Sequence, residues 1–152
     1  AVAMVAYLRA ISDVTPNPQP VSGERTTDRL DAADDPTTAK LKAATDLTEG
    51  ERLYLDNCSA CHMPDGKGAP GVFPALAGNS LVNAATTRGL TDVILNGAAM
   101  PSTEKRPERL AMPAFADRLS DAEVATLATF LRSAWGNSAP AVKEDDVKAV
   151  RP

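Results

Sequence analysis

The chain has 152 residues, of which 43% are hydrophobic, 4% are aromatic and 24% are charged, and its formal net charge is −4 at pH 7. This length suits one domain with a modest core, and the mild acidity argues against nucleic-acid binding. Apolar runs stay well short of the roughly 18 residues that a membrane-spanning helix needs. We therefore expect no transmembrane segment in this chain.

The first residues, 1–12, are predicted to form an amphipathic helix because apolar side chains recur there at helical spacing, at Val2, Val5, Ala6 and Leu8. The segment has neither a basic start nor an initiating methionine. It is therefore expected to be the inside of a longer or processed chain rather than a signal peptide.

Residues 13–44 are predicted to be a linker, since alternating prolines and a polar, charge-mixed run break any periodicity. The main domain is expected at 45–137. The remaining residues, 138–152, are predicted to be a C-terminal tail, and their charged run at 143–146 is typical of a solvated segment.

Two capping boxes predict helix starts in the main domain. Thr48 is followed three residues later by Glu51, and Ser120 is followed at the same spacing by Glu123. The second box precedes apolar residues at helical spacing, with a stop near Gly136. Another helix is predicted for 91–96, before a glycine, and because no strand pattern competes we predict a mostly α domain.

The first capped helix leads into Cys58-Ser59-Ala60-Cys61-His62. On a helical turn, cysteines three apart lie on one face and can reach neighbouring edges of a porphyrin, and the next residue points its imidazole at the iron. The spacing therefore predicts one covalent haem c, with Cys58 and Cys61 as thioethers and His62 as an axial ligand. A buried haem would also supply apolar volume that so few aromatic residues leave unfilled.

Other uses of a Cys-x-x-Cys pair need partners that this sequence lacks. A structural zinc site takes four N or S ligands and an iron–sulfur cluster usually takes four cysteines, whereas the chain holds 2 cysteines and 1 histidine. A thioredoxin-type redox pair needs alternating strands and helices, which the pattern does not show. Two structural cysteines beside a chance histidine remain the simplest alternative.

With a single histidine in the chain, the sixth iron ligand is expected to be a methionine. Met63 adjoins His62 and would face the wrong side of the ring, and Met4 lies beyond the linker. Met112 lies in an apolar stretch before the last helix, and the proline after it makes the loop rigid. We predict Met112 as the ligand, with Met100 as the alternative; a core-filling role for Met112 also stays open.

The order of capped helix, Cys-x-x-Cys-His, long loop, Met-Pro and second capped helix resembles a class I cytochrome c over about residues 45–137. The resemblance implies an all-α fold of several helices wrapped round one haem. It also implies that Gly50 and Tyr54 let the first helix cross the last at close range, and that the Pro74 carbonyl accepts a hydrogen bond from His62. An ordinary turn proline is the alternative for Pro74.

A narrower resemblance rests on Met112-Pro113-Ala114-Phe115 and on the segments 119–123 and 133–137. These are similar to the last haem domain of cytochrome subunits that accompany membrane-associated alcohol, gluconate or nicotinate dehydrogenases, which commonly carry three such domains. Residues 1–11 resemble the closing helix of a preceding domain. We therefore expect a fragment of a multihaem subunit, although only one attachment motif is present; a free-standing monohaem cytochrome or an enzyme-fused one stays open.

The resemblance implies an electron carrier rather than an enzyme. It would pass single electrons from a dehydrogenase cofactor or a neighbouring haem to a downstream acceptor, docking weakly on redox proteins. Because haem c is attached outside the bacterial cytoplasm, the resemblance also implies a periplasmic location; membrane association through a parent chain or a partner stays open. The alternatives are a ligand-binding or peroxidase-like haem protein with an open or labile sixth position, and a module whose haem only stabilises the fold.

Overall fold

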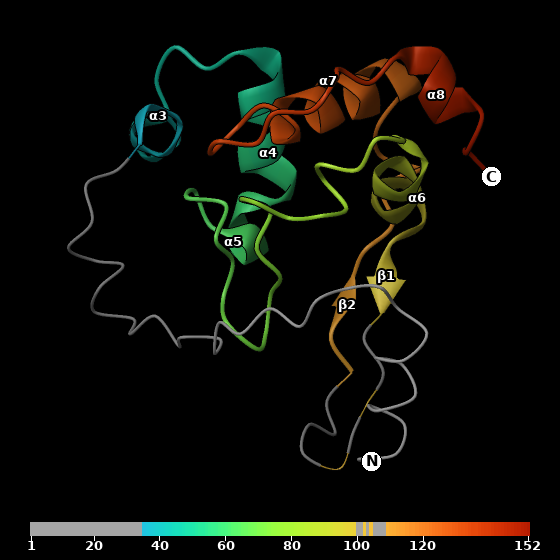
Figure 1. The fold of residues 1–152 in the computed structure, drawn as a ribbon, viewed down its shortest axis with the longest axis horizontal. Coiled ribbons are helices and arrows are strands. Elements are labelled where there is room, and N and C mark those ends of the chain that lie inside the picture. Colours follow the sequence, from blue (N-terminus) through green and yellow to red (C-terminus); the bar gives the residue numbers. More distant parts are fainter. Residues whose placement is uncertain (1–34, 100–101, 103, 105–108) are drawn as a thin grey trace, which may run out of the picture. The chain divides into compact units, whose positions relative to one another are not determined.

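The computed structural model describes residues 35–99, 102, 104 and 109–152, which belong to a unit spanning residues 34–152. The predicted helix at 1–12, most of the predicted linker and Met100 lie outside the described residues. In chain order the described elements are α3 (Pro36–Ala43), α4 (Glu49–Asn57), α5 (Ser59–His62), α6 (Arg88–Asn96), β1 (Ala98–Ala99), β2 (Ala111–Met112), α7 (Asp121–Leu131) and α8 (Glu144–Lys148) (Figure 1).

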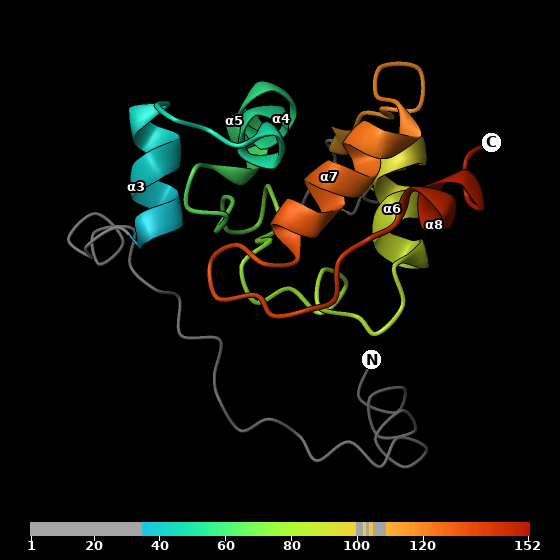
Figure 2. The same ribbon diagram turned by 90° about the horizontal axis from the view of Figure 1, so that it is seen from above.

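Helices α4 and α7 cross in close contact (Figures 1 and 2). The crossing occurs at Gly50, where an added Cβ would lie 2.8 Å from Phe130 Cβ and 3.2 Å from the Thr126 carbonyl oxygen. A larger residue would force the two helices apart. The close packing that the resemblance implied at Gly50 is confirmed.

Both predicted capping boxes are present. Thr48 Oγ1 accepts from the backbone N–H of Glu51, and Glu51 Oε2 accepts from that of Thr48; Ser120 and Glu123 form the same pair at α7. Helix α6 ends before Gly97 as predicted but begins at residue 88, three residues earlier than expected. Helix α7 ends at residue 131, earlier than the predicted stop.

A short antiparallel pair was not expected from the sequence. β1 pairs with β2, with Ala98 opposite Met112 and Ala99 opposite Ala111. Two-residue strands are too short to show a period-2 pattern, so they could not be predicted, and the domain is still mostly α as expected. The pairing fixes Met112 next to the end of α6.

The prediction of an extended linker is wrong for residues 36–43, which form α3. Asp35 caps this helix by accepting from the backbone N–H groups of Thr37 and Thr38, and Pro36 occupies its first turn. Leu41 is buried in the core. An Asp-Pro pair after a polar run is as typical of a helix start as of a linker.

The C-terminal segment also departs from the prediction of a solvated tail. Its charged residues at 143–145 are exposed as expected, but Val142 and Val147 are buried in the core. Helix α8 packs against α6 and α7 (Figure 2). An acidic helix with one valine shows little apolar periodicity, because a short helix needs few buried side chains to dock.

An aromatic cluster joins α4 to the end of α7. The rings of Tyr54, Phe130 and Trp135 pack with centroids 5.0–5.6 Å apart. Two of them also hold the loop after the Cys-x-x-Cys-His motif, because Tyr54 Oη donates to the Met63 carbonyl oxygen and Trp135 Nε1 donates to that of Pro64 at 3.1 Å. The cluster therefore fixes this loop as well as the helix crossing.

Glu51 links the start of α4 to α3. Its Oε2 accepts from Lys40 Nζ at 2.7 Å and from the Thr48 N–H at 2.7 Å. Burial alone would raise the pKa of Glu51, but the hydrogen bonds from Lys40 and Thr48 outweigh it and hold the pKa below its ordinary value. The ionised form is therefore favoured by folding.

We expect Glu51→Gln to destabilise the protein at neutral pH and to matter progressively less in acid. A carboxyl whose pKa is lower in the folded state stabilises the fold above its unfolded pKa, and this stabilisation is lost as pH falls through the folded pKa. Guanidinium unfolding between pH 7 and pH 3 measures the difference. Glu49→Gln, which changes an exposed carboxylate of the same turn, is the control. If the unfolding free energies of the wild type and E51Q differ by the same amount at every pH, the lowered pKa of Glu51 is contradicted.

We expect Gly66→Ala to cost about 3 kcal/mol of unfolding free energy and Gly71→Ala about 1 kcal/mol. Both glycines have positive φ, +63° and +73°, which strains any alanine. At Gly66 the new Cβ would also lie 2.6 Å from the Trp135 ring, whereas at Gly71 no such atom lies within 4 Å. Equal losses in guanidinium unfolding would show that the contact with Trp135 is unimportant.

Candidate haem site

The Cys-x-x-Cys-His motif lies where α4 passes into α5. The Cys58 N–H donates to the Tyr54 carbonyl oxygen at 2.8 Å, and the His62 N–H donates to the Cys58 carbonyl oxygen at 2.9 Å. These bonds place Cys58, Cys61 and His62 on adjoining helical turns, as the spacing predicted. Cys58 is buried, Cys61 is exposed, and neither forms a disulfide.

Two adjoining cavities lie beside the motif, with volumes of about 160 Å³ and 100 Å³ and almost wholly apolar linings. Cys61 lines the first cavity and Leu131 the second. Several lining residues are common to both cavities, which makes them parts of one hollow: Cys58, His62, Pro74, Val93, Met112 and Phe115. The hollow therefore gathers both cysteines, the histidine and one predicted methionine.

The ring of His62 is fixed by a backbone carbonyl. His62 is 8% exposed, and its Nδ1 lies 2.9 Å from the Pro74 carbonyl oxygen. A carbonyl oxygen can only accept, so the proton of the neutral ring belongs on Nδ1, which leaves Nε2 with a lone pair. The contact that the resemblance implied for Pro74 is present.

Backbone hydrogen bonds hold the loop that carries Pro74. The Gly68 N–H donates to the His62 carbonyl oxygen at 3.0 Å, and the Leu76 N–H donates to the Gly66 carbonyl oxygen at 2.7 Å. Gly68 also lies so close to Pro74 that an added Cβ would be 2.6 Å from the Pro74 carbonyl oxygen. The acceptor for His62 is thus placed by a tightly folded turn. Its sequence, Asp-Gly-Lys-Gly, is typical of turns.

Two polar side chains hold the next part of the loop, a role that was not predicted for either of them. Asn137 is 6% exposed and accepts from the Gly78 N–H at 2.9 Å. Arg132 is fully buried and donates to the carbonyl oxygens of Val82 and Ala84, each at 2.9 Å, and of Pro140 at 2.6 Å. Their partners are mostly backbone atoms 48–61 residues away, which no local pattern can reveal.

Met112 reaches the hollow from β2 and is half-buried. Its position depends on Gly97, where an added Cβ would lie 2.5 Å from the Met112 carbonyl oxygen. The following loop is fastened to α6, since the N–H groups of Phe115 and Ala116 each donate at 3.1 Å to the carbonyl oxygens of Ile94 and Leu95. The alternative, Met100, is outside the described residues.

The thiol of Cys58 does not have the properties of a redox nucleophile. Burial raises its pKa to about 12, with a smaller contribution from the nearby Cys61. A reactive or redox-active cysteine needs a lowered pKa. The burial of Cys58 therefore argues against the thioredoxin-type interpretation of the motif.

The donor set fits a haem better than a bare metal ion. Among the residues that the structure describes, no group of three or more His, Cys, Asp or Glu could hold a metal ion. An imidazole with a free Nε2, a thioether and two thiols at one apolar hollow are instead the groups that bind and ligate haem c. Each comes from a segment held in place by hydrogen bonds.

Comparison with known proteins agrees with this site. A family model described as cytochrome c matches residues 47–135. The cytochrome c subunit of a quinone-dependent alcohol dehydrogenase from Gluconobacter oxydans is 40% identical over 119 residues, which are 78% of this chain and 25% of that protein.

Two further relatives also match over a small share of their own length. The gluconate 2-dehydrogenase cytochrome c subunit of Pantoea cypripedii is 33% identical over 78% of this chain and 27% of that protein. A subunit of the nicotinate dehydrogenase of Pseudomonas putida is 39% identical over 62% of this chain and 8% of that protein. The chain thus spans about a quarter or less of the relatives described here. With its helical fold and its matched motif, this chain belongs to the cytochrome c family.

Proposed function

We propose that this chain is an electron-transfer domain that binds one haem c through Cys58 and Cys61, with His62 and Met112 as the axial ligands. The observation that carries the proposal is the single apolar hollow that all four residues line. Members of the cytochrome c family bind haem c covalently, and the relatives are named as cytochrome c subunits of dehydrogenases. When bound, the haem supplies an iron that changes its charge by one electron.

The residues around the hollow have distinct roles in this proposal. Pro74 holds the His62 ring in one orientation, and its carbonyl makes the imidazole a better donor. The Met112 thioether is a soft ligand that favours the ferrous state, and the apolar lining disfavours the additional charge of the ferric state. Both effects raise the reduction potential.

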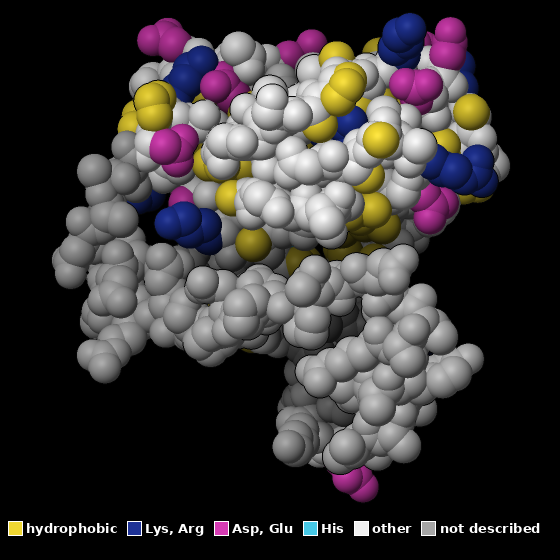
Figure 3. All heavy atoms as spheres, in the orientation of Figure 1, with side chains coloured by type: hydrophobic (Ala, Val, Ile, Leu, Met, Phe, Trp, Pro, Cys, Tyr) yellow, Lys and Arg dark blue, Asp and Glu magenta, His cyan; other side chains and the backbone are white. Residues whose placement is uncertain are grey.

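The proposed partners are redox proteins, namely a dehydrogenase subunit or domain, a neighbouring haem domain and a downstream acceptor. On the face seen in Figure 3, acidic and basic side chains of the described residues lie interspersed around the edge, so neither sign dominates it. Steering by long-range charge from the described side chains of this face is therefore weak.

A periplasmic location and a place as one haem domain of a longer polypeptide are part of the same proposal. Among the described residues, no helix is long and apolar enough to cross a membrane.

We expect Met112→Ala to abolish the weak far-red sulfur-to-iron charge-transfer band of the oxidised holoprotein, because the thioether is its source. The measurement is an absorption spectrum of the purified ferric protein. Met100→Ala is the matched control and should keep the band. Loss of the band in M100A, with the band kept in M112A, would reverse the ligand assignment.

We expect the dithionite-reduced wild-type spectrum to stay unchanged when carbon monoxide is added, because both axial positions are held. A rapid shift to a carbonyl adduct in the wild type would instead favour a ligand-binding haem protein.

His62→Ala should fail to yield stable holoprotein, since the fixed axial donor is lost. A normal holoprotein from H62A would refute the role of His62.

A further inference from the structure

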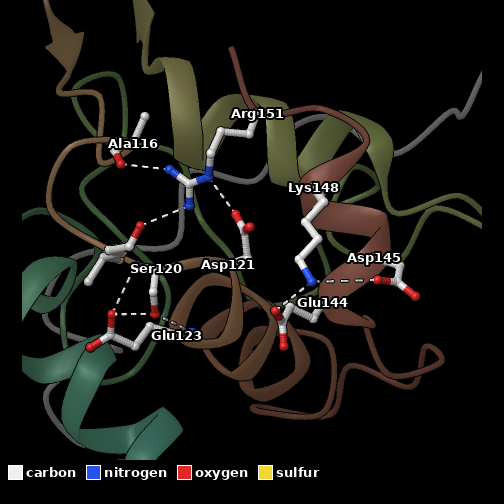
Figure 4. A network of polar contacts seen from close by, with 9 residues as sticks. Ala116, Ser120, Asp121, Glu123, Glu144, Asp145, Lys148 and Arg151 are labelled. Carbon is white, nitrogen blue, oxygen red and sulfur yellow. Dashed lines mark hydrogen bonds and ion pairs between the residues drawn. The ribbon is translucent and has the colours of Figure 1, made fainter.

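We propose that Arg151 is a positioning residue that holds the loop after Met112 and thereby slows the release of this ligand. The inference rests on the proposed axial role of Met112. Its basis is a set of contacts between the guanidinium of Arg151 and the segment that joins Met112 to α7 (Figure 4).

Every nitrogen of the Arg151 guanidinium contacts this segment or the first residue of α7. Nη1 donates to the Ala116 carbonyl oxygen at 2.6 Å, Nη2 donates to that of Leu119 at 2.9 Å, and Nε donates to the Asp121 carboxylate. The side chains of Arg151 and Asp121 are 25% and 19% exposed, so the pair is partly shielded from water. A guanidinium presents its donors in a fixed planar fork that matches several fixed acceptors, whereas an ammonium is a compact charge on a flexible stem.

The loop depends on this contact because its two ends are held differently. On the side nearer Met112, the N–H groups of Phe115 and Ala116 donate to carbonyl oxygens at the end of α6. On the far side, Arg151 binds the carbonyl oxygens of Ala116 and Leu119. Ala116 is thus bound through both of its backbone polar groups, one toward α6 and one toward Arg151.

Arg151 is itself anchored. Its N–H donates to the Val147 carbonyl oxygen at 3.0 Å, and Val147 is fully buried against the core. Helix α8 contacts both α6 and α7. The guanidinium therefore extends from the turn that follows a docked helix, so that moving the loop outward would break its hydrogen bonds rather than carry the arginine along.

Lys148 provides a matched control. It lies on α8 with the same charge, but its Nζ pairs with Glu144 at 2.8 Å and Asp145 at 3.8 Å, both within the same helix (Figure 4). These pairs are exposed and contribute little to stability. Lys148→Met removes a positive charge from α8 without touching the loop.

The experiment measures how fast imidazole replaces Met112 in the ferric holoprotein at saturating imidazole, by stopped-flow absorption. An external ligand can bind only after the thioether has left, so the limiting rate reports release of Met112. We expect Arg151→Met to raise this rate about tenfold, as the loss of charge-assisted hydrogen bonds predicts. Lys148→Met is expected to keep the wild-type rate.

A second readout separates loop release from global destabilisation. Opening of the loop alone exposes little surface, so the release rate should depend only weakly on guanidinium, whereas global unfolding would make it depend steeply. In the holoprotein, amide hydrogen exchange at Phe115 and Ala116 should accelerate in R151M. Exchange at Val124, within α7, should stay as in the wild type.

Each remaining outcome has a defined meaning. If R151M does not accumulate as holoprotein, Arg151→Lys replaces it and should show the same acceleration, because lysine keeps the charge but not the three-way contact. Release in both Arg151 variants no faster than in K148M would overturn the inference while leaving Met112 as ligand. Persistence of the sulfur band in M112A would instead refute Met112 as the axial ligand, the part of the proposed function on which the inference rests.

Discussion

The close crossing of α4 and α7 at Gly50 is the constraint on which the rest of the structure depends. Because no side chain separates the helices there, Phe130 lies directly against α4, and the Tyr54 and Trp135 rings pack around it. Helix α4 continues into the Cys-x-x-Cys-His turn. The crossing therefore determines where both cysteines and His62 lie relative to α7 and the residues that follow it.

The residues that directly follow α7 in turn organise the loops. Arg132, Trp135 and Asn137 each donate to backbone carbonyls in the loop segments after His62. Arg132 is fully buried, and a buried cation is tolerated only when its donors are satisfied. Its hydrogen bonds to the loop and to Pro140 meet that requirement. The same hydrogen bonds offset the cost of burying the charge and fix the loop.

Local features of the fold could be predicted from sequence because their causes are local. A capping box joins residues three apart, and the attachment motif fits within five consecutive residues. Thr48 and Ser120 therefore marked true helix starts, and Gly97 a true helix end. The Pro74 contact came from a family resemblance rather than from spacing, yet the carbonyl lies where that resemblance implied.

The missed features share a physical reason. Arg132 and Arg151 bind mainly carbonyl oxygens, and every residue carries a carbonyl, so no residue type marks the partner. The β1–β2 pair is too short for an alternating pattern, and the one buried side chain of α8 is that of Val147. Such interactions become visible only after the chain has folded, because distant segments must first be brought together.

Arg132 and Arg151 bind, in the same way, two irregular segments that flank the hollow. Neither the 79–84 loop nor the 113–119 loop lies in a helix or named strand, so their carbonyls have few ladder partners and would otherwise bind water. A guanidinium anchored just after the end of a packed helix replaces those partners with fixed donors. Electron transfer benefits from surroundings that keep one arrangement in both charge states. By fixing both loops, the C-terminal part of the chain therefore contributes to the rigidity of the hollow.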